Sequence, residues 1–300
     1  MKVYLNDPIS PEAVRRLKEH VEIIDNFDHP EELDAIIVRQ QYCPAEVIRR
    51  ATKCRLIQQH GVGLDRIDTA AAAECGIPVK NTPGINSRSV AEYTVAMMLD
   101  LSRKVTETDK KTRKGLLKAF GMPETVGTEM TRKRIGLIGS GHVAQHVAQI
   151  CRDGFQMEIC CYNPHRSEEE ILAMGFTPLS LHELFSLCNY VSLHCLLTPE
   201  TYHMINSSCF ENCNPNLILI NTARGGLIDE HALYEALASG KIRAAGLDVF
   251  EQQPPAIDNP LLTLDNFLAG MHVAGSTIEA LERNGKAVVD SVFEALGIEE

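Results

Sequence analysis

The sequence has no apolar run long enough to cross a membrane, and it begins with M-K-V-Y-L-N-D-P, a strand-like segment rather than a signal peptide. It is poor in positive charge, since 29 lysines and arginines against 40 aspartates and glutamates give a formal net charge of −11. This balance argues against nucleic-acid binding. The ten cysteines are irregularly spaced, and no second pair accompanies Cys209 and Cys213, so neither a disulfide framework nor a zinc site is expected. We therefore expect a cytoplasmic protein with reduced thiols and with no metal, nucleic-acid or membrane partner.

The remaining composition is that of a globular protein, and 300 residues are enough for two domains. Strand-like and helix-like segments alternate in the first hundred residues: strands are expected at 3–6, 33–38 and 55–59, and helices at 11–20 and 44–51. A second alternating series starts near residue 134, with strands expected at 135–138, 158–162, 190–193, 217–221, 244–249 and 267–270, and helices at 143–151, 168–174, 181–187 and 230–238. This alternation predicts parallel sheets covered on both faces. Longer helices, at 89–105 and 278–296, flank the second series and indicate that the chain leaves one domain, builds the other and returns.

A nucleotide-binding fingerprint, I-G-L-I-G-S-G-H-V-A, occupies residues 135–144. Gly139 and Gly141 follow a short apolar strand and open a helix, which is the context that the fingerprint requires. Gly139 permits the tight turn, Gly141 lets the backbone approach a pyrophosphate, and Ala144 stands where a third glycine would fit. The motif predicts binding of a dinucleotide.

The end of the next strand, Y-N-P-H-R, bears on the choice between NAD and NADP. An acidic residue there would bind the ribose hydroxyls of NAD and repel the extra phosphate of NADP. This chain has Asn163, which can bind a hydroxyl without excluding a phosphate. Arg166, and His165 when protonated, could bind that phosphate, although Arg166 could equally face solvent. The sequence leaves the preference open.

Two residues further along suit hydride transfer to an anionic substrate. Arg224, within N-T-A-R-G-G-L-I-D, can bind a carboxylate through two parallel hydrogen bonds, the alternative being an ion pair with Asp229. His272, within H-V-A-G-S-T, can give a proton to a carbonyl or take one from an alcohol, the alternative being a structural histidine. Near the N-terminus, Gly61 and Gly63 end a strand in a turn that is either a substrate loop or a simple glycine turn.

Together these motifs resemble the D-2-hydroxyacid dehydrogenase family, which contains phosphoglycerate dehydrogenases, hydroxypyruvate and glyoxylate reductases and D-lactate dehydrogenases. The resemblance extends over nearly the whole chain and includes G-V-G-L-D-R-I-D (61–68), N-T-P-G-I-N-S-R-S-V-A-E (81–92) and V-S-L-H-C-L-L-T-P-E-T (191–201). It implies an α/β fold with two doubly wound parallel-sheet domains, a Rossmann-type cofactor domain inserted into a flavodoxin-like substrate domain, and usually a homodimer. We place the substrate domain at 1–98, the dinucleotide-binding domain at 99–274, and a returning C-terminal helix at 275–300.

The resemblance also implies roles for individual residues. It assigns the substrate carboxylate to Arg224 and the acid/base step to His272, with the active site between the domains. Val62, Gly63 and Asn86 would bind the small anionic 2-oxo or 2-hydroxy acid. The cofactor, NAD or NADP, would contact Ser87, Gly139, Gly141, His142, Val143, Asn163, Arg166, Cys195, Leu196, Thr201, Thr222, Ala223, Asp248 and Gly275.

The chain departs from the family at several of these positions. Gln253 stands where the family usually has the glutamate that pairs with its histidine, and a neutral amide orients an imidazole without stabilising its charge. Glu251 is expected to point to the other face. Further departures are His142 for an arginine, Asn163 for an acid and Leu196 for a proline.

These features give three hypotheses. The first is an NAD(P)-dependent oxidoreductase interconverting a small 2-oxo acid and a D-2-hydroxy acid, with Arg224, Gln253 and His272 as catalytic residues. The second is a formate-dehydrogenase-like activity, because hydride loss from formate needs no proton transfer and a glutamine beside the histidine is typical of that branch. The third is a dinucleotide-sensing binding protein without catalysis, although retention of both Arg224 and His272 favours an enzyme. The particular 2-hydroxy acid and the physiological direction are not indicated by the sequence.

Overall fold

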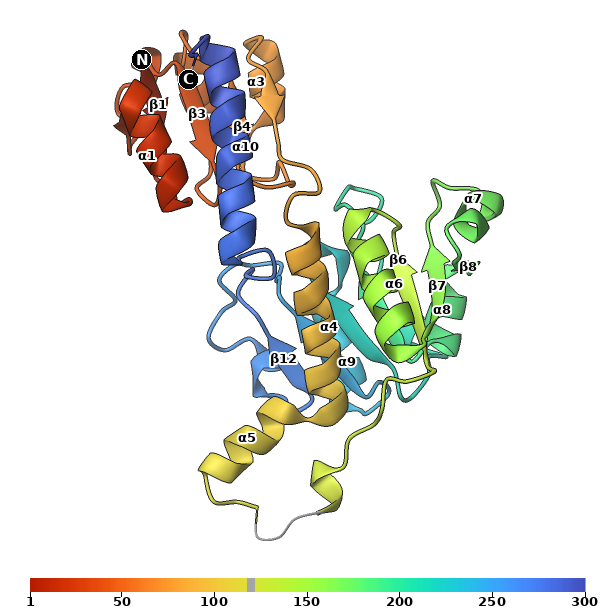
Figure 1. The fold of residues 1–300 in the computed structure, drawn as a ribbon. Helices are drawn as coiled ribbons and strands as arrows, with labels where there is room; N and C mark the ends of the chain where they lie inside the picture. Colours follow the sequence, from red (N-terminus) through yellow and green to blue (C-terminus); the bar gives the residue numbers. More distant parts are fainter. Residues whose placement is uncertain (118–121, 300) are drawn as a thin grey trace. The chain divides into compact units, whose positions relative to one another are not determined.

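The structure, a computed structural model, describes residues 1–117 and 122–299. Its chain forms two compact units (Figure 1), of which unit 1 comprises Met1–Asn86 and Ser276–Glu300 and unit 2 comprises Ser87–Gly275. Each unit contains one parallel sheet, five-stranded in unit 1 and seven-stranded in unit 2 over the described residues. The predicted fold class, an α/β fold with two parallel-sheet domains, is therefore confirmed.

Unit 1 has the strand order β2-β1-β3-β4-β5, which is the flavodoxin-like order. Its strands are β1 (Lys2–Tyr4), β2 (Glu22–Ile24), β3 (Ala35–Val38), β4 (Ile57–Gln59) and β5 (Val79–Lys80), and its helices are α1 (Pro11–His20), α2 (Ala45–Arg50), α3 (Thr69–Glu74) and α10 (Ile278–Leu296). Successive side chains of a strand point to opposite faces. Ala35 and Ile37 therefore pack in the core under α1 and α10, whereas Ile36 and Val38 pack in the core under α2 and α3.

The two long helices of unit 1 begin at polar caps. The Ser10 hydroxyl accepts a hydrogen bond from the Ala13 amide at 3.3 Å, and Pro11 occupies the first helical position of α1. The Thr277 hydroxyl likewise accepts from the Ala280 amide at 3.1 Å at the start of α10. Both helices have the predicted bounds.

Unit 2 has the strand order β12-β11-β10-β9-β6-β7-β8, in which β6 lies between β7 and β9. Its strands are β6 (Arg134–Ile138), β7 (Glu158–Tyr162), β8 (Thr177–Pro178), β9 (Tyr190–Leu193), β10 (Ile218–Asn221), β11 (Ala244–Leu247) and β12 (Phe267–Ala269). Its α-helices are α4 (Ser87–Arg103), α5 (Val105–Arg113), α6 (His142–Phe155), α7 (Glu168–Ala173), α8 (Leu181–Leu187) and α9 (Glu230–Ala238). This is the Rossmann order with one further strand, so the order reverses at β6 and β9.

The units divide earlier in the chain than the predicted boundary at residues 98 and 99. That boundary falls inside α4, and the structure places the whole of α4 in unit 2. The physical reason is packing, because Met97 and Met98 of α4 share a buried core with Val147 and Ala148 of α6. The helix expected to connect the domains therefore belongs to the second one, and the chain passes between the units at Asn86 and Ser87 and again at Gly275 and Ser276.

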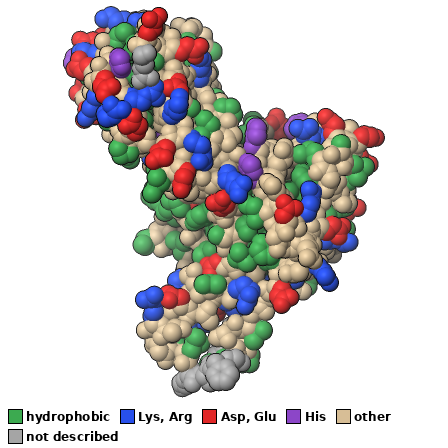
Figure 2. Space-filling model, viewed as in Figure 1, with side chains coloured by type: hydrophobic (Ala, Val, Ile, Leu, Met, Phe, Trp, Pro, Cys, Tyr) green, Lys and Arg blue, Asp and Glu red, His purple; other side chains and the backbone are tan. Residues whose placement is uncertain are grey.

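On the face shown in Figure 2, acidic and basic side chains are interspersed rather than gathered by sign. Within the described part of the chain, none of the helices combines the length and the apolar character needed to cross a membrane.

Candidate active site

The predicted cofactor and catalytic residues of unit 2 follow the C-terminal ends of its strands. Gly139 follows β6, Asn163 follows β7, Cys195 follows β9, Arg224 follows β10, Asp248 follows β11 and His272 follows β12. Because the strands are parallel, these turns share one edge of the sheet. Open α/β sheets bind ligands at this edge, next to the point where the strand order reverses.

The glycine turn after β6 has the shape that a dinucleotide requires. Gly139 has a φ of +94°, and a Cβ there would lie 2.8 Å from the backbone oxygen of His194, so a larger residue would clash. A Cβ on Gly141 would instead meet nothing within 4 Å, which leaves open space before the first turn of α6. The amides of His142 and Val143 begin this helix, and a pyrophosphate fits such a helix N-terminus.

Ser140, between the two glycines, connects the turn to the end of β7. Its buried hydroxyl accepts hydrogen bonds from Asn163 Nδ2 at 2.8 Å and from Arg166 Nε at 2.9 Å. Asn163 Oδ1 accepts from the His165 amide at 3.0 Å. Arg166 is therefore fixed beside the glycine turn rather than simply facing solvent, and the sequence analysis missed Ser140, although its place inside the fingerprint was a signal.

The loop after β9 is closed by its own hydrogen bonds. The Thr201 hydroxyl donates to the Leu196 carbonyl at 2.7 Å and accepts from the Thr198 amide at 2.7 Å. Cys195 Sγ lies 3.9 Å from Met204 Sδ, and burial raises the pKa of this thiol to about 11. Leu196 is 69% exposed and presents an apolar surface at this edge of the sheet.

The turn after β10 is shaped by Asn221, which is fully buried. Its Oδ1 accepts from the Ala223 amide at 2.9 Å, and its Nδ2 donates to the Arg224 carbonyl at 2.8 Å. The half-buried Arg224 donates from Nη1 to the Ala223 carbonyl at 2.7 Å. Thr222 lies 2.9 Å, hydroxyl to hydroxyl, from Thr94 of α4. Asn221 therefore fixes the backbone that carries Arg224.

Gly225 brings this turn against the segment that leads to Gln253. It begins a short 3₁₀ helix, η4 (Gly225–Leu227), and a Cβ on it would lie 2.0 Å from the carbonyl carbon of Phe250 and 2.3 Å from the amide nitrogen of Glu251. Only a glycine permits this backbone contact. Arg224 and Gln253 therefore come from two touching segments.

His272 lies in a turn that Asp248 holds. The His272 amide donates to the Asp248 carbonyl at 2.6 Å, and the two carboxylate oxygens accept from the amides of Val273 at 3.1 Å and Ala274 at 2.8 Å. Burial raises the pKa of the Asp248 carboxyl, and these amides counteract the shift. His272 itself has a φ of 55°, so this backbone is held in the left-handed region.

Gln253 orients the imidazole of His272. Its Nε2 donates to the Phe250 carbonyl at 3.1 Å, which turns its Oε1 toward His272 Nδ1 at 2.9 Å. An amide oxygen only accepts, so Nδ1 carries the hydrogen and Nε2 is the acceptor nitrogen of the neutral ring. Glu251 has other partners, because its Oε1 lies 2.8 Å from His203 Nε2 and its amide donates to Glu230 Oε1 at 2.8 Å.

The remaining predicted residues lie in unit 1 or where the chain passes between the units. Val62 and Gly63 form the turn after β4, in which the Val62 carbonyl accepts from Asn81 Nδ2 at 2.7 Å. Asn86 ends the first segment of unit 1, whereas Ser87 and Gly275 are the first and last residues of unit 2. Their roles in binding stay predictions.

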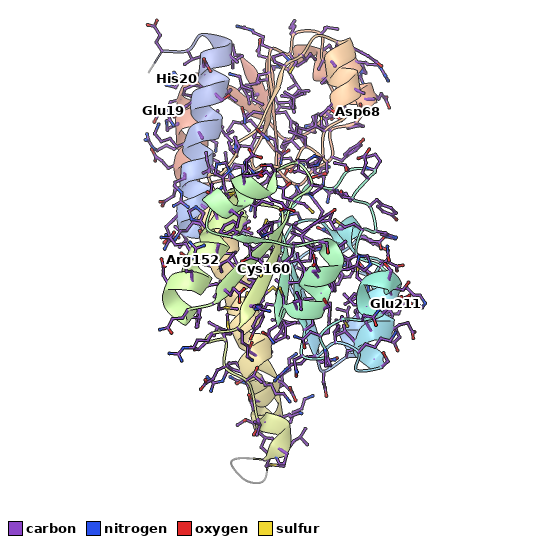
Figure 3. All side chains as sticks on the ribbon, turned by 90° about the vertical axis from the view of Figure 1, so that its right-hand side faces the viewer. Glu19, His20, Asp68, Arg152, Cys160 and Glu211 are labelled. Carbon is purple, nitrogen blue, oxygen red and sulfur yellow. The ribbon has the colours of Figure 1, made fainter. Side chains whose placement is uncertain are left out.

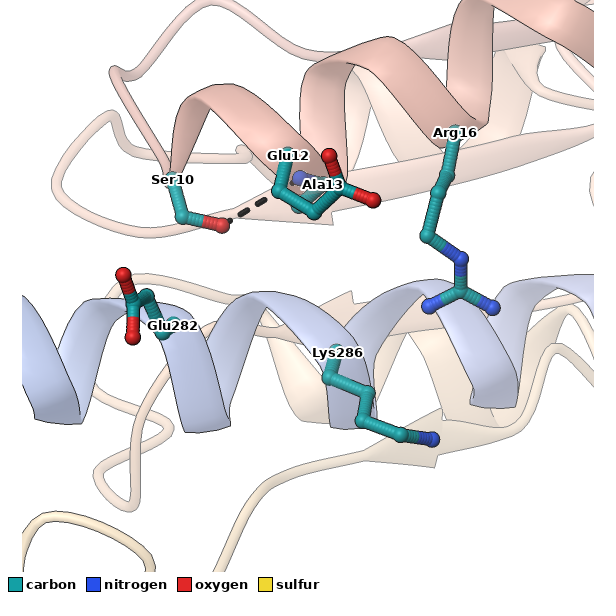
Figure 4. A pocket seen from close by; sticks show the side chains of 6 residues that line it. All are labelled: Ser10, Glu12, Ala13, Arg16, Glu282 and Lys286. Atoms are coloured by element: carbon teal, nitrogen blue, oxygen red, sulfur yellow. Dashed lines mark hydrogen bonds between the residues drawn. The ribbon is translucent and has the colours of Figure 1, made fainter.

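A groove between α1 and α10 of unit 1 contains none of the predicted residues (Figure 4). Its lining includes two cations, Arg16 and Lys286, and two acids, Glu12 and Glu282. Both cations pair with Asp290, at 2.8 Å and 2.6 Å respectively. The opposing charges of this groove do not favour one class of ligand.

Residues 95–274 match the family model described as "D-isomer specific 2-hydroxyacid dehydrogenase, NAD binding domain". The predicted cofactor class, NAD or NADP, is thereby confirmed, while the preference stays open. A hydroxypyruvate reductase from Thermotoga maritima is 37% identical over 99% of this chain and 99% of its own. A D-3-phosphoglycerate dehydrogenase from Archaeoglobus fulgidus is 36% identical over 97% of this chain, which spans 56% of that relative. Among solved structures, the TT0316 protein from Thermus thermophilus is similar with a TM-score of 0.91 and 31% identity, over 100% of this chain and 98% of its own.

Proposed function

Since this chain belongs to the D-isomer-specific 2-hydroxyacid dehydrogenase family, we propose that it interconverts a small 2-oxo acid and the matching D-2-hydroxy acid by hydride transfer. The predicted family is confirmed, and with it the enzyme class, an NAD(P)-dependent oxidoreductase acting on CH–OH donors. One observation supports the proposed catalytic residues. Gln253 Oε1 lies 2.9 Å from His272 Nδ1, and the segment that leads to Gln253 contacts the turn that carries Arg224.

The dinucleotide would lie along the C-terminal edge of the sheet of unit 2. The open space before Gly141 supports this position for the pyrophosphate, which the amides of His142 and Val143 would hold. A bound nicotinamide supplies or accepts the hydride. We propose further contacts from Ser87, Asn163, Arg166, Cys195, Leu196, Thr201, Thr222, Ala223, Asp248 and Gly275.

Arg224 would bind the carboxylate of the substrate. A guanidinium can donate two parallel hydrogen bonds to a carboxylate, which fixes both the position and the rotation of the neighbouring carbonyl. Asn221 donates to the backbone carbonyl of Arg224. This hydrogen bond fixes the backbone position from which the guanidinium extends. Orientation of this kind accounts for a large part of the rate of a reaction between two bound partners.

His272 would move the proton. With Nδ1–H on Gln253, the neutral ring has its lone pair on Nε2, which can accept the proton of an alcohol, and the protonated ring can donate from Nε2 to a carbonyl oxygen. Because Gln253 is neutral, it orients both forms without favouring the charged one. Reduction of the oxo acid therefore depends more on ambient pH than it would with a carboxylate partner.

We also propose that Val62, Gly63 and Asn86 bind the substrate, and that the enzyme is a homodimer. The observation that supports dimerisation is α5, a fully described helix in which no residue is buried. Val105, the first residue of this helix, is 60% exposed, and the apolar side chain of Val126 is 61% exposed. The mass in solution, measured by light scattering, tests this part. A cytoplasmic location stays a prediction.

A coenzyme oxidation assay tests the main proposal. NADH and NADPH are offered with glyoxylate, hydroxypyruvate, pyruvate and phenylpyruvate, and we expect turnover of at least one acid that Arg224→Ala strongly reduces. If Arg224→Ala leaves the kinetics unchanged, its assignment is wrong. If the coenzyme binds and no acid reacts, the sensing protein becomes the better hypothesis.

The neutral partner of His272 favours a second candidate, hydride transfer from formate. Formate loses a hydride and becomes carbon dioxide without giving up a proton, so an imidazole and an amide suffice. Formation of NADH or NADPH from formate, together with no turnover of the oxo acids, would select this reaction.

A further inference from the structure

We infer that the preferred coenzyme of this chain is NADP(H), with Arg166 binding the 2′-phosphate of the adenosine ribose and Ser140 holding Arg166 in place. This inference deepens the proposed function and rests on it only for the presence of a dinucleotide at the edge of unit 2. The observations that support the preference for NADP(H) are the hydrogen bonds of Asn163 and Arg166 at the end of β7.

The residue that follows β7 is not acidic. The two ribose hydroxyls of NAD are donors that an acidic residue at the end of the second strand ordinarily binds. Here that position is Asn163, and both ends of its amide have partners inside the turn: Nδ2 with Ser140 Oγ and Oδ1 with the His165 amide. Asn163 thus shapes the turn, and it carries no charge to repel a phosphate.

Arg166 is a donor that is already held in place. Arg166 uses Nε to reach Ser140, which is 2% exposed and belongs to the glycine turn itself. The guanidinium is therefore held at the side of the turn where β7 ends by Nε, and Ser140 does not engage its two Nη groups. A phosphate can accept two parallel hydrogen bonds from them.

Three acidic residues follow Arg166 closely in the sequence. Glu168, Glu169 and Glu170 form the first turn of α7, and Glu170 Oε1 lies 3.6 Å from Arg166 Nη1. Glu170 is also engaged by the Ser167 amide, which donates to its Oε2 at 2.8 Å. An exposed carboxylate at this distance contributes little, whereas a phosphate carries up to two charges and matches the guanidinium geometrically. The acids reduce the preference without reversing it.

The test measures binding to the full chain in the absence of substrate. Isothermal titration with 2′,5′-ADP and ADP, and with NADP⁺ and NAD⁺, compares ligands that differ mainly by the 2′-phosphate. A charge-assisted pair predicts about 10- to 100-fold tighter binding of the phosphorylated ligand of each pair. The ratio should shrink as salt rises, because the pair is exposed.

Three variants separate the parts of the inference. Arg166→Ala should reduce the ratio to near one while leaving the affinity for NAD⁺ within about twofold, and Ser140→Ala should lose part of the ratio because the guanidinium is no longer held. Asn163→Asp should favour NAD⁺. The matched control is Arg152→Ala, which removes an arginine of α6 (Figure 3) that donates to the Gly175 carbonyl at 2.8 Å, and it should keep the ratio of the parent.

Equal or tighter binding of NAD⁺ by the parent overturns the inference, and so does an Arg166→Ala variant that weakens both coenzymes alike. Selective binding of NADP⁺ without turnover of any oxo acid overturns the proposed function and supports this inference. Failure to bind either dinucleotide overturns both.

Discussion

Replacing Gly225 by alanine would place a methyl group against the backbone of a neighbouring segment. The added Cβ would lie 2.0 Å from the carbonyl carbon of Phe250, 2.1 Å from its oxygen and 2.3 Å from the amide nitrogen of Glu251. All three are backbone atoms, so no side-chain rotation can relieve the contact. The two segments must move apart, and these are the segments that carry Arg224 and Gln253.

The size of the movement follows from the distances. Ordinary contact begins near 3.4 Å, so the shortest separation must grow by about 1.4 Å. Overpacking of this kind costs about 1–3 kcal/mol of stability, or more when backbone is involved. Misplacing a substrate-orienting group by about 1 Å can reduce the rate by about 100-fold. We therefore expect Gly225→Ala to lose about two orders of magnitude in kcat/KM while most of the fold is retained.

The assay combines steady-state kinetics on the best oxo acid with urea unfolding of the same preparation. Gly154→Ala is the matched control, because Gly154 lies in α6 and a Cβ there would meet nothing within 4 Å. Alanine in this helix should raise the free energy of unfolding by about 0.5–1 kcal/mol and leave kinetics unchanged. If Gly225→Ala shows parental stability and parental kcat/KM, the argument from close backbone approach is refuted.

Other expectations follow from the same site and from unit 1. Arg224→Lys keeps the charge but loses the parallel pair of hydrogen bonds, so KM for the oxo acid should rise by about tenfold or more, and an unchanged KM would contradict bidentate binding. Gln253→Glu should speed oxo-acid reduction by up to about tenfold near pH 8, where most imidazoles are neutral, and pH profiles of kcat that coincide with the parent's would remove the missing carboxylate as a limit. His60 is buried, and burial lowers the pKa of its imidazole to about 4. In the unfolded chain the imidazole has an ordinary pKa near 6.5, so between about pH 6.5 and pH 4 the unfolded state binds a proton that the folded state does not. The free energy of unfolding should therefore decrease by up to about 3 kcal/mol as the pH is lowered through this window. His60→Gln should flatten that part of the stability profile, as measured by urea unfolding at pH 7, 5.5 and 4.5, whereas an unaltered slope would show that His60 does not carry it.

Longer elements with a clear pattern were predicted well from the sequence. The bounds of α1, α8, α9 and α10 agree residue by residue with the structure, because each combines an apolar face with a capping side chain. The strands β2, β5 and β8 were not predicted, since they have only two or three residues and take their form from a neighbouring strand. Helices α3 and α5 were missed as well. The alanine-rich α3 lacks a marked polar face, and α5 has no buried residue to produce an apolar pattern.

The site shows the same division between local and distant information. The glycine turn and the residues after each strand could be placed on one edge, because parallel strands dictate that arrangement. The bond from Ser140 to Arg166 and the contact of Gly225 with Phe250 join residues about 25 positions apart. The spacing of residues in the sequence does not predict such contacts, so they can be identified only from the folded structure.

Because unit 2 interrupts unit 1, synthesis on the ribosome separates the two halves of unit 1 in time. Ala35 and Ile37 share a buried cluster with Val288 and Val292 of α10, which are translated only after every residue of unit 2. Until then one apolar face of the first sheet lacks α10 and is covered by α1 alone, whereas unit 2 is complete at Gly275 and can fold independently. The nascent chain therefore depends on chaperones or on rapid completion at that stage, and substitutions in α10 should lower the yield of folded protein more than they lower the stability of the molecules that mature.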